Sequence, residues 1–387
     1  MKSDPNKISA AYIEPQTPIT IKSTLSNDYV KFGVLNNFPQ NVSQWLRESK
    51  IQRGIINNKT FFMTGNRFTS ENESVVDLIG RIGLEKSFFT HHRNANFDFL
   101  SCGNTYLRVV TDRSKKWFKI EHVDYTKCRV NKDHDVVVNP DWTNYNKTNN
   151  IVIPLFPKFD VVPNEKNLFH SMIHIKSYEP SFDFYGVPSW LSCLVNARLD
   201  DKTDKWNESH VDTGYKTDNI FKFPTGTKDD EIKSVKDAHD EYKNGQPNGF
   251  FYLYGDGMEV YPQNQNVFDV DWQKLNNLNI DKLIIGNEWY KSIMSISQAT
   301  GFDTERTKND YQLALVQIND RQKMFIDIYK QMFEFFGVDA SDLAIYNESI
   351  IPNDNPVDQL NKLQAFFTDE QKQIVADYYL KKLKLIE

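Results

Sequence analysis

Two groups of side chains in the sequence have the residue types that bind metals or assist hydrolysis. The neighbours His91 and His92 offer two imidazoles, and Asp200, Asp201 and Asp204 offer carboxylates of the kind that hold Mg²⁺. Adjacent side chains point in different directions on a helix or strand, and the histidines lack a third ligand at a metal-binding spacing. We therefore expect His91 and His92 to lie at the surface or at an interface rather than to bind a metal together. Because lysines alternate with the aspartates, we expect a polar helix face that contacts solvent or another subunit.

The sequence motifs of several common catalytic centres are absent. There is no G-x-x-x-x-G-K-[ST] phosphate loop, no G-x-S-x-G nucleophile turn and no H-E-x-x-H zinc motif. The three cysteines, Cys102, Cys128 and Cys193, are far apart and include no C-x-x-C pair, which favours a reducing compartment over disulfides or a zinc ribbon. The sequence therefore predicts neither an enzyme with a self-contained active site nor a bound cofactor or metal.

Charge and hydropathy narrow the class of protein further. The chain of 387 residues has a formal net charge of −6 and 39 % hydrophobic residues, which is typical of a globular protein with a real core. Proteins that hold DNA tightly through its phosphates usually carry a basic excess, so any contact with nucleic acid is expected to be weak. No apolar run reaches the ~20 residues that a membrane helix requires, and no secretory leader is expected.

The first half of the chain has the pattern of a mixed α+β region that follows an irregular first forty residues. The segment NVSQWLRESKIQRGIINNKTFFMTG predicts two short helices, with Ser49 and Gln52 as a capping box. The segment FDFLSCGNTYLRVV predicts a helix end, a turn at Gly103 and a strand from Thr105 to Val110. Short runs of β-formers between turn residues then indicate a small antiparallel sheet.

The second half has the pattern of long helices around a small insert. A Tyr-Gly-Val-Pro turn precedes a helix predicted from Ser189 to Val211, which begins apolar and continues polar. The insert predicts a strand at NIFKFP, a charged helix from Thr227 to Lys243 and a hairpin with its turn at Gly255–Gly257. The remaining expected elements are a helix at 271–295, a polar break at 297–304, a long helix at 305–336 and two helices after residue 355.

The order of these elements and their local motifs resembles the portal proteins, or head–tail connectors, of tailed bacteriophages. Four stretches carry the resemblance: YVKFGVLNNFPQNVSQWLRESKIQRGIINNKTFFMTGNRF, FDFLSCGNTYLRVV, IHIKSYEPSFDFYGVPSWLSCL and DKLIIGNEWYKSIMSISQATGF. The first contains a Gly-x-x-Asn-x-Phe-Pro element that looks like the portal N-terminal pattern. The third contains the Tyr-Gly-Val-Pro turn that opens the first stem helix of portals. The resemblance covers residues 28–336 and is weaker beyond them.

The resemblance implies a portal fold of the α+β class, with a mixed α/β wing, two long stem helices, a small α/β clip insert, a long tunnel helix and a helical crown. The implied divisions are an N-terminal arm at 1–27, the wing at 28–188, stem helix 1 at 189–213, the clip at 214–270, stem helix 2 at 271–296, a tunnel loop at 297–304, the long tunnel and wing helix at 305–337, and the crown at 338–387.

The same resemblance implies a structural function in a virion. Portal proteins form a ring, usually a dodecamer, at one capsid vertex, and double-stranded DNA is packaged and ejected through the ring. The implied partners are other copies of the chain, weakly and non-specifically held double-stranded DNA, the terminase large subunit, the major capsid protein and scaffold, and a head–tail adaptor, with no membrane. Assembly in the cytoplasm of a bacterial host is implied as well.

Three sets of site residues follow from the resemblance. The DNA channel and tunnel loop would comprise Ser297, Gln298, Ala299, Thr300, Gly301, Phe302, Asp303 and Thr304, with Lys291 and Lys308 beside them. The clip, where the terminase would dock, would use Lys228, Lys233, Lys236 and Asp256. The start of the first stem helix would depend on Tyr185, Gly186, Pro188 and Trp190.

Two alternatives remain open at the level of sequence. A head–tail adaptor or other structural virion protein would share much of the pattern, and the size of the assembled particle separates it from a portal ring. A metal-dependent phage nuclease is less favoured, because it would rely on the aspartate group at 200–204 alone. A nuclease assay with added metal separates that reading from a structural one.

Overall fold

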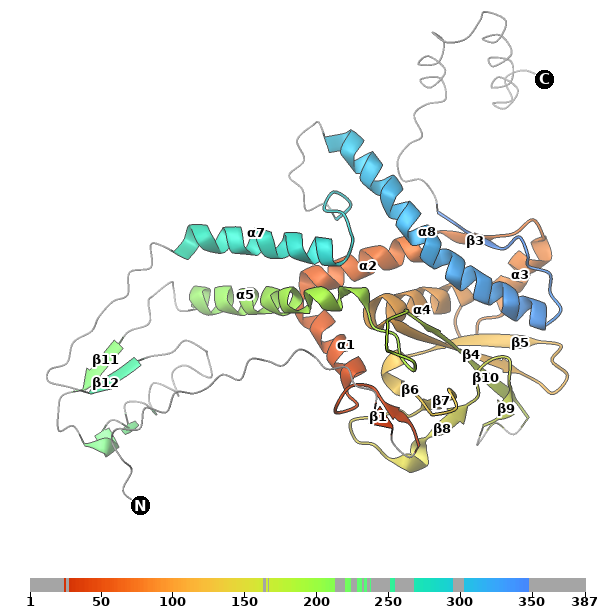
Figure 1. Cartoon of the computed structure of the whole chain (residues 1–387), viewed down its shortest axis with the longest axis horizontal. Coiled ribbons are helices and arrows are strands. Elements are labelled where there is room, and N and C mark those ends of the chain that lie inside the picture. The colour runs from red at the N-terminus through yellow and green to blue at the C-terminus, as the bar shows by residue number, and fades with distance from the viewer. Residues whose placement is uncertain are drawn as a thin grey trace, which may run out of the picture.

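The computed structural model describes residues 24–25, 28–162, 165, 167–212, 220–223, 228–231, 233–234, 237, 251–254, 268–294 and 303–347. Within these ranges the chain is a mixed α+β protein, which agrees with the fold class expected from the sequence. Figure 1 shows a body of sheets and packed helices, from which two helices, α5 and α7, project side by side.

A four-stranded antiparallel sheet lies in the centre of the body. Its order is β5-β4-β10-β9, and its strands are β4 (Asn104–Thr111), β5 (Phe118–Val123), β9 (Asp160–Val161) and β10 (Phe169–Lys176). Strand β4 pairs with β10 along its whole length, from Asn104 opposite Lys176 to Thr111 opposite Phe169. The predicted strand Thr105–Val110 is confirmed and is one residue longer at each end.

A second, five-stranded antiparallel sheet has the order β1-β2-β6-β7-β8. Its strands are β1 (Thr24–Leu25), β2 (Val30–Lys31), β6 (Cys128–Val130), β7 (Val136–Val138) and β8 (Ile151–Ile153). The short 3₁₀ helix η1 (Tyr125–Lys127) leads from β5 into β6, and η2 (Lys147–Asn149) precedes β8. The prediction that the first forty residues are irregular was wrong for β1 and β2, because these strands pair with each other.

The first helices of the body are α1 (Phe38–Glu48), α2 (Lys50–Thr64), α3 (Glu73–Arg81) and α4 (Phe88–Cys102). The two predicted short helices are therefore confirmed as α1 and α2. The hydroxyl of Ser49 accepts a hydrogen bond from Gln52 N at 3.2 Å, so one half of the predicted capping box is present. Helix α4 ends at Gly103, whose φ of +73° is a left-handed conformation that glycine adopts without strain.

The long helix α8 (Asp303–Phe335) closes the hydrophobic core of the body. It was predicted from Glu305 to Phe336 and is confirmed within two residues at each end. Its buried side chains Phe325, Tyr329 and Phe333 pack against aromatic rings from α4, β3 and β5. These residues recur at i, i+4 and i+8, and this helical spacing places them on one face.

The first described element after α8 is a strand, whereas a helical crown was expected at 338–387. Strand β13 (Ala344–Tyr346) pairs antiparallel with β3 (Arg67–Thr69), so this part of 338–387 belongs to the body. The helices predicted after residue 355, and the capping box expected there, lie outside the described residues.

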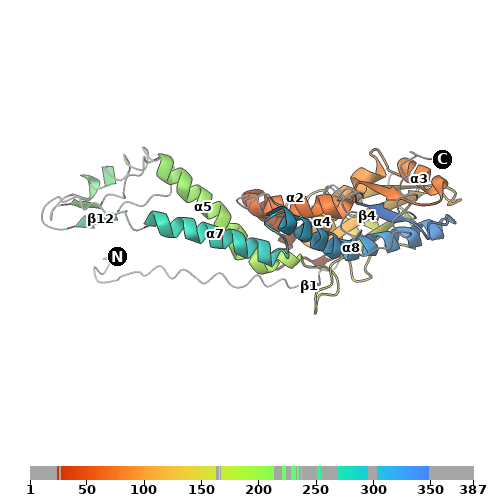
Figure 2. The ribbon, with the colours of Figure 1, turned by 90° about the horizontal axis from the view of Figure 1, so that it is seen from above.

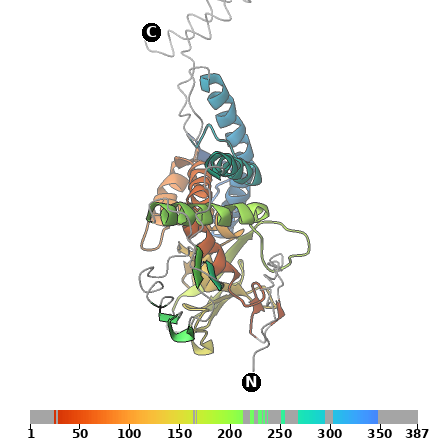
Figure 3. The same ribbon diagram turned by 90° about the vertical axis from the view of Figure 1, so that its left-hand side faces the viewer.

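The projecting helix pair consists of α5 (Leu194–Asp212) and α7 (Phe268–Gly286), and the 3₁₀ helix η3 (Ser189–Cys193) leads into α5. Figures 2 and 3 show from two further directions that the helices lie together near the body and diverge away from it. The prediction of one helix from 271 to 295 was wrong at its end. Helix α7 stops at Gly286, whose Cβ would lie 2.6 Å from the Cβ of Cys193, and Glu288 then takes a left-handed φ of +52°.

The insert between α5 and α7 is described only in part. Strands β11 (Ile220–Phe223) and β12 (Phe251–Tyr254) pair in parallel, with Ile220 opposite Phe251. The predicted strand at NIFKFP is confirmed as β11. The turn of the predicted hairpin, at 255–257, lies outside the described residues, as does the end of the charged helix expected to reach Lys243.

Candidate functional site

The turn that begins the projecting helix pair is buried between the two sheets. The hydroxyl of Tyr185 donates to Val30 O at 2.5 Å and accepts from Val130 N at 3.0 Å, and its ring stacks on Phe32 with centroids 4.1 Å apart. Burial raises the pKa of Tyr185 well above its ordinary value, so the hydroxyl keeps the proton that it donates. Tyr185 therefore ties this turn to β2 and β6.

Gly186 is required here by close packing of backbones. A Cβ at this position would lie 2.2 Å from Gly103 O and 2.6 Å from Ser177 N. The backbone of Gly186 is outside the left-handed region, so its conformation alone does not demand glycine. What excludes a side chain is the contact with the end of α4 and the end of β10.

Pro188 and Trp190 stand at the start of the first projecting helix. Pro188 stands at the N-cap of η3 with φ −70°, and its carbonyl accepts from Leu191 N at 3.1 Å. The Trp190 side chain is fully buried, and its indole N–H donates to Ser101 O at 2.9 Å. Trp190 therefore holds the start of this helix in the core.

The aspartates of α5 do not form one metal site. Asp200 is buried and accepts from Ser49 Oγ at 2.8 Å and from Ile51 N at 3.2 Å, so its carboxylate stabilises the N-terminus of α2. Asp201 pairs with a lysine of its own helix, and Asp204 with one of α2. The expectation of a solvated or subunit-facing surface was wrong for Asp200, because α5 packs on α2 at that point.

A buried polar cluster holds the inner end of α7 against α2. The side-chain amides of Gln52 and Asn287 exchange two hydrogen bonds, of 3.1 and 2.8 Å, and the buried Lys59 Nζ donates to Asn287 O at 2.7 Å. Nearby, the indole of Trp289 donates to Asn58 Oδ1 at 2.9 Å. Burial lowers the pKa of Lys59 to about 7, because the charged ammonium loses its hydration.

The prediction of surface or interface histidines was wrong, because His91 and His92 are both buried in α4. His91 Nε2 lies 2.7 Å from Leu84 O, and its Nδ1 accepts from His122 N at 3.1 Å. His92 Nδ1 lies 2.9 Å from Tyr329 Oη, and burial lowers the pKa of His92 to about 3. Both rings are hydrogen-bonding parts of the core. No group of three metal-binding side chains occurs among the residues that the structure describes.

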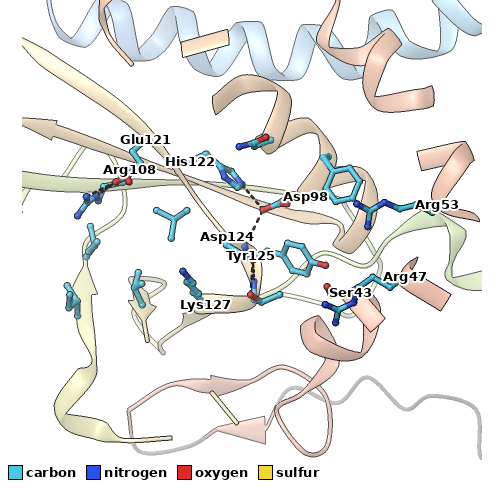
Figure 4. A pocket seen from close by; sticks show the side chains of 17 residues that line it. Ser43, Arg47, Arg53, Asp98, Arg108, Glu121, His122, Asp124, Tyr125 and Lys127 are labelled. Carbon is cyan, nitrogen blue, oxygen red and sulfur yellow. Dashed lines mark hydrogen bonds and ion pairs between the residues drawn. The ribbon is translucent and has the colours of Figure 1, made fainter. Parts of the chain in front are cut away.

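A cleft of about 720 Å³ opens between the two sheets and the corner of α1 and α2 (Figure 4). Inside it, Asp98 Oδ2 lies 2.6 Å from His122 Nε2 and accepts from Tyr125 N at 3.2 Å. Burial raises the pKa of Asp98 to about 6, an effect that the bond to His122 partly offsets. Arg108 pairs with Glu121 at 2.6 Å on the same side. An Asp–His pair can move a proton, but no nucleophile is hydrogen-bonded to this one among the described residues.

The residues of this cleft were missed by the sequence analysis. They come from seven separate segments between Ser43 and Ile153, and no local spacing connects such segments. The one available signal was Asp98, a carboxylate within the apolar run FDFL. A charged residue in such a run is either exposed or paired, and here it is paired with His122.

The other predicted site residues are only partly described. Ser297, Gln298, Ala299, Thr300, Gly301 and Phe302 lie outside the described residues, as do Lys236 and Asp256, whereas Asp303 and Thr304 begin α8. Lys291 pairs with Asp281, and Lys308 is half-buried. Lys228 and Lys233 are exposed. No helix among the described residues is long and apolar enough to cross a membrane.

Comparison with known proteins identifies the fold. No protein-family model and no curated protein matches the chain. Among solved structures, a chain from the virion of the native gene transfer agent (GTA) particle matches with a TM-score of 0.53 at 11 % identity, over 87 % of this chain and 93 % of that one. A chain from the neck of the empty GTA particle, computed with C6 symmetry, matches with a TM-score of 0.52 at 12 % identity over the same shares. The fold of this chain is thus one that occurs in GTA particles.

Proposed function

We propose that this chain is a portal-type head–tail connector, a structural virion protein whose copies form a ring for the passage of double-stranded DNA. The observation that carries the proposal is the projecting helix pair, which is fixed to an α+β body by the buried turn at 185–190 and by the cluster around Asn287. The fold similarity to chains of the GTA neck and virion supports the same assignment.

Exposed aliphatic side chains on the projecting helices support assembly into a ring. Val195 on α5 is 77 % exposed, and Leu278 and Ile285 on α7 are 56 % and 74 % exposed. Burying one such side chain stabilises a contact by about 1.5–3 kcal/mol, so a helix pair that shows several of them to water favours an interface. Neighbouring copies in a closed ring would cover the same face in every subunit.

The channel would be lined by the loop between α7 and α8. Residues 297–304 cover the last part of the chain between α7 and α8 together with the first two residues of α8, and their only charge is Asp303. A loop of this composition would contact DNA sterically, without phosphate salt bridges. Weak contact suits a channel through which DNA must slide. The negative net charge of the chain would also weaken its contact with DNA phosphates. Lys291 and Lys308 remain the nearest candidate phosphate contacts.

The partners of the ring would bind its two ends. The insert at 214–270 would form the clip, where Lys228, Lys233, Lys236 and Asp256 would contact the terminase large subunit and later a head–tail adaptor. The body, as the wing, would contact the major capsid protein and scaffold at one capsid vertex. Packaging energy would come from the terminase, and this chain would act without catalysis or a cofactor.

The mass of the purified protein tests the proposal. A ring of twelve chains of 45.3 kDa has a mass of roughly half a megadalton, which light scattering measures, while negative-stain images show whether the particle has a central hole. We expect Ile285→Asp to shift the protein towards smaller species, and Val152→Asp, at a 50 % exposed position of β8, to leave the ring intact. A wild-type monomer at all concentrations would contradict the proposal, and a small oligomer without a hole would favour the adaptor.

A further inference from the structure

The cleft between the two sheets has an apolar floor on one side. Val138 of β7 lies directly opposite Ile151 of β8, and Ile153 follows Ile151 by two residues. The three side chains therefore lie on the same face of the sheet. All three line the cleft, and Phe97 of α4 and Val123 of β5 extend the apolar surface. An extended chain with aliphatic side chains at alternate positions matches such a floor.

Positively charged side chains also line the cleft. Arg47 stands in the last turn of α1 and Arg53 near the start of α2, and Figure 4 shows both side chains reaching towards Tyr125. The guanidinium of Arg53 lies 4.8 Å from the ring centroid of Phe97, which holds it over the cleft. Lys127 lines the cleft from η1. These three cations are exposed, and none forms an ion pair within the part of the chain that the structure describes.

The carboxylates of the cleft have other partners. Glu121 accepts from Arg108, Asp98 lies against His122, and Asp124 Oδ1 accepts from Thr126 N at 2.8 Å. The three free cations therefore face the cleft in a chain whose net charge is −6. Charge complementarity selects an acidic occupant, and the flat apolar floor selects aliphatic side chains.

The geometry points to this cleft as a docking site for an acidic, extended peptide segment of a partner protein, in which carboxylates alternate with aliphatic residues. The carboxylates would pair with Arg47, Arg53 and Lys127, and the aliphatic side chains would lie on the β7–β8 floor. Arginine binds carboxylates with two parallel hydrogen bonds, so the two arginines would determine most of the affinity. This inference does not depend on the ring, because all of the cleft lies within one subunit.

The test uses the purified full-length chain at pH 7.5 and the hexapeptide LDLELD carrying a neutral dye, with fluorescence anisotropy as the readout. We expect saturable binding that weakens with salt and that falls at least about tenfold in the double variant Arg47→Glu/Arg53→Glu, because two charge-assisted pairs become repulsive. The exposed Arg93→Glu on α4, outside the cleft, is the matched control and should bind as the wild type does. Ile151→Ser should weaken binding through the floor, and circular dichroism should show that each variant is folded.

Several outcomes would overturn the inference. These are an absence of saturable binding up to about 1 mM, equal binding by the double variant, and equal binding of the charge-reversed peptide LKLKLK. A 20-base-pair duplex or oleate is also added as a competitor of the peptide. If either displaces the peptide from the wild type and does not bind the double variant, the cleft would be assigned to phosphates or to fatty acids instead. Loss of the ring in the double variant would identify a second copy of this chain as the occupant. A monomeric wild type that still binds LDLELD would contradict only the proposed ring.

Discussion

Asn104 and Gly186 exchange two hydrogen bonds at the point where the projecting helix pair leaves the body. Asn104 Nδ2 donates to Gly186 O at 2.8 Å, and Gly186 N donates to Asn104 Oδ1 at 2.8 Å. The buried Asn104 thus pairs with the backbone of Gly186 as a neighbouring strand would, at the first residue of β4. Both backbone groups of Gly186 are satisfied although no sheet reaches them, which makes this turn a fixed part of the core.

We expect Gly186→Ala to destabilise the protein by at least about 2 kcal/mol, because the new Cβ would displace the carbonyl of Gly103. Urea unfolding of the variant measures this loss. The matched control is Gly80→Ala in α3, where a Cβ would meet no atom within 4 Å. The control should be neutral or more stable by roughly 0.5–1 kcal/mol, since alanine favours a helix. Equal stability of the two variants would contradict the crowding at Gly186.

Trp190→Ala is expected to cost about 3–5 kcal/mol of unfolding free energy, because it opens a cavity and leaves Ser101 O without its indole donor. Thermal melting followed by circular dichroism measures the effect. Trp117→Ala, at a residue that is 40 % exposed, removes the same side chain at the surface and should change the melting temperature little. A melting temperature unaffected by Trp190→Ala would show that Trp190 does not anchor η3.

The stability of the wild type relative to Lys59→Met should rise with pH above about 7. Burial and the nearby charge of Arg321 lower the pKa of Lys59 from 10.5 to about 7. Between these values the unfolded chain holds a proton that the folded chain has lost, so the unfolding free energy increases by up to about 1.4 kcal/mol per pH unit. Below about pH 7 both states are protonated, and the contribution is constant.

Urea unfolding of wild type and Lys59→Met at several values between pH 6 and pH 9.5 tests this expectation, since the other titrating groups cancel in the difference. Lys116→Met, at an exposed position between β4 and β5, controls for the loss of one positive charge. A difference between wild type and Lys59→Met that stays constant over the whole range would mean that Lys59 titrates normally in the folded protein.

Deleting Gln298 to Thr300 should leave ring assembly nearly normal and impair DNA packaging or retention. The helices on both sides have their own anchors: Asn287 is held by Lys59, and Ser292 Oγ donates to Asp310 Oδ2 at 2.6 Å. The assays are particle mass and the amount of DNA protected from nuclease in assembled particles. Replacing the three residues by Gly-Ser-Gly keeps the length of the loop and should reduce the amount of packaged DNA less than the deletion does. Loss of rings in the deletion variant would refute the proposed tunnel loop.

Charge reversals at Lys233 and Lys236 should weaken binding of the terminase large subunit by about tenfold and leave the ring intact, if the charged helix of the insert is its docking surface. Lys116→Glu in the body serves as the control for charge reversal at a distant exposed lysine. Co-sedimentation with the terminase measures binding, and light scattering measures the ring. Normal packaging with both lysines reversed would remove this helix from the docking surface.

Elements whose signals are local could be predicted from the amino-acid sequence alone. The spacing of Phe325, Tyr329 and Phe333 marked α8, the glycine at 103 marked the end of α4, and Ser49 marked the start of α2. Each signal acts within about one helical turn or one tight turn, so no distant residue is needed to interpret it.

The contacts between those elements could not be predicted in the same way, because they depend on the packing of the whole fold. The side chain of Gln52, expected to complete a capping box with Ser49, pairs instead with Asn287, which is 235 residues away. His91, His92 and Asp200 have the residue types of a metal site. All three are buried, and each forms hydrogen bonds with a different part of the protein. Burial and pairing depend on which surfaces meet when the sheets and helices pack, and a buried polar group must find its partner wherever the fold provides one. The cleft, the amide pair and the buried lysine therefore appear only once the whole core is assembled.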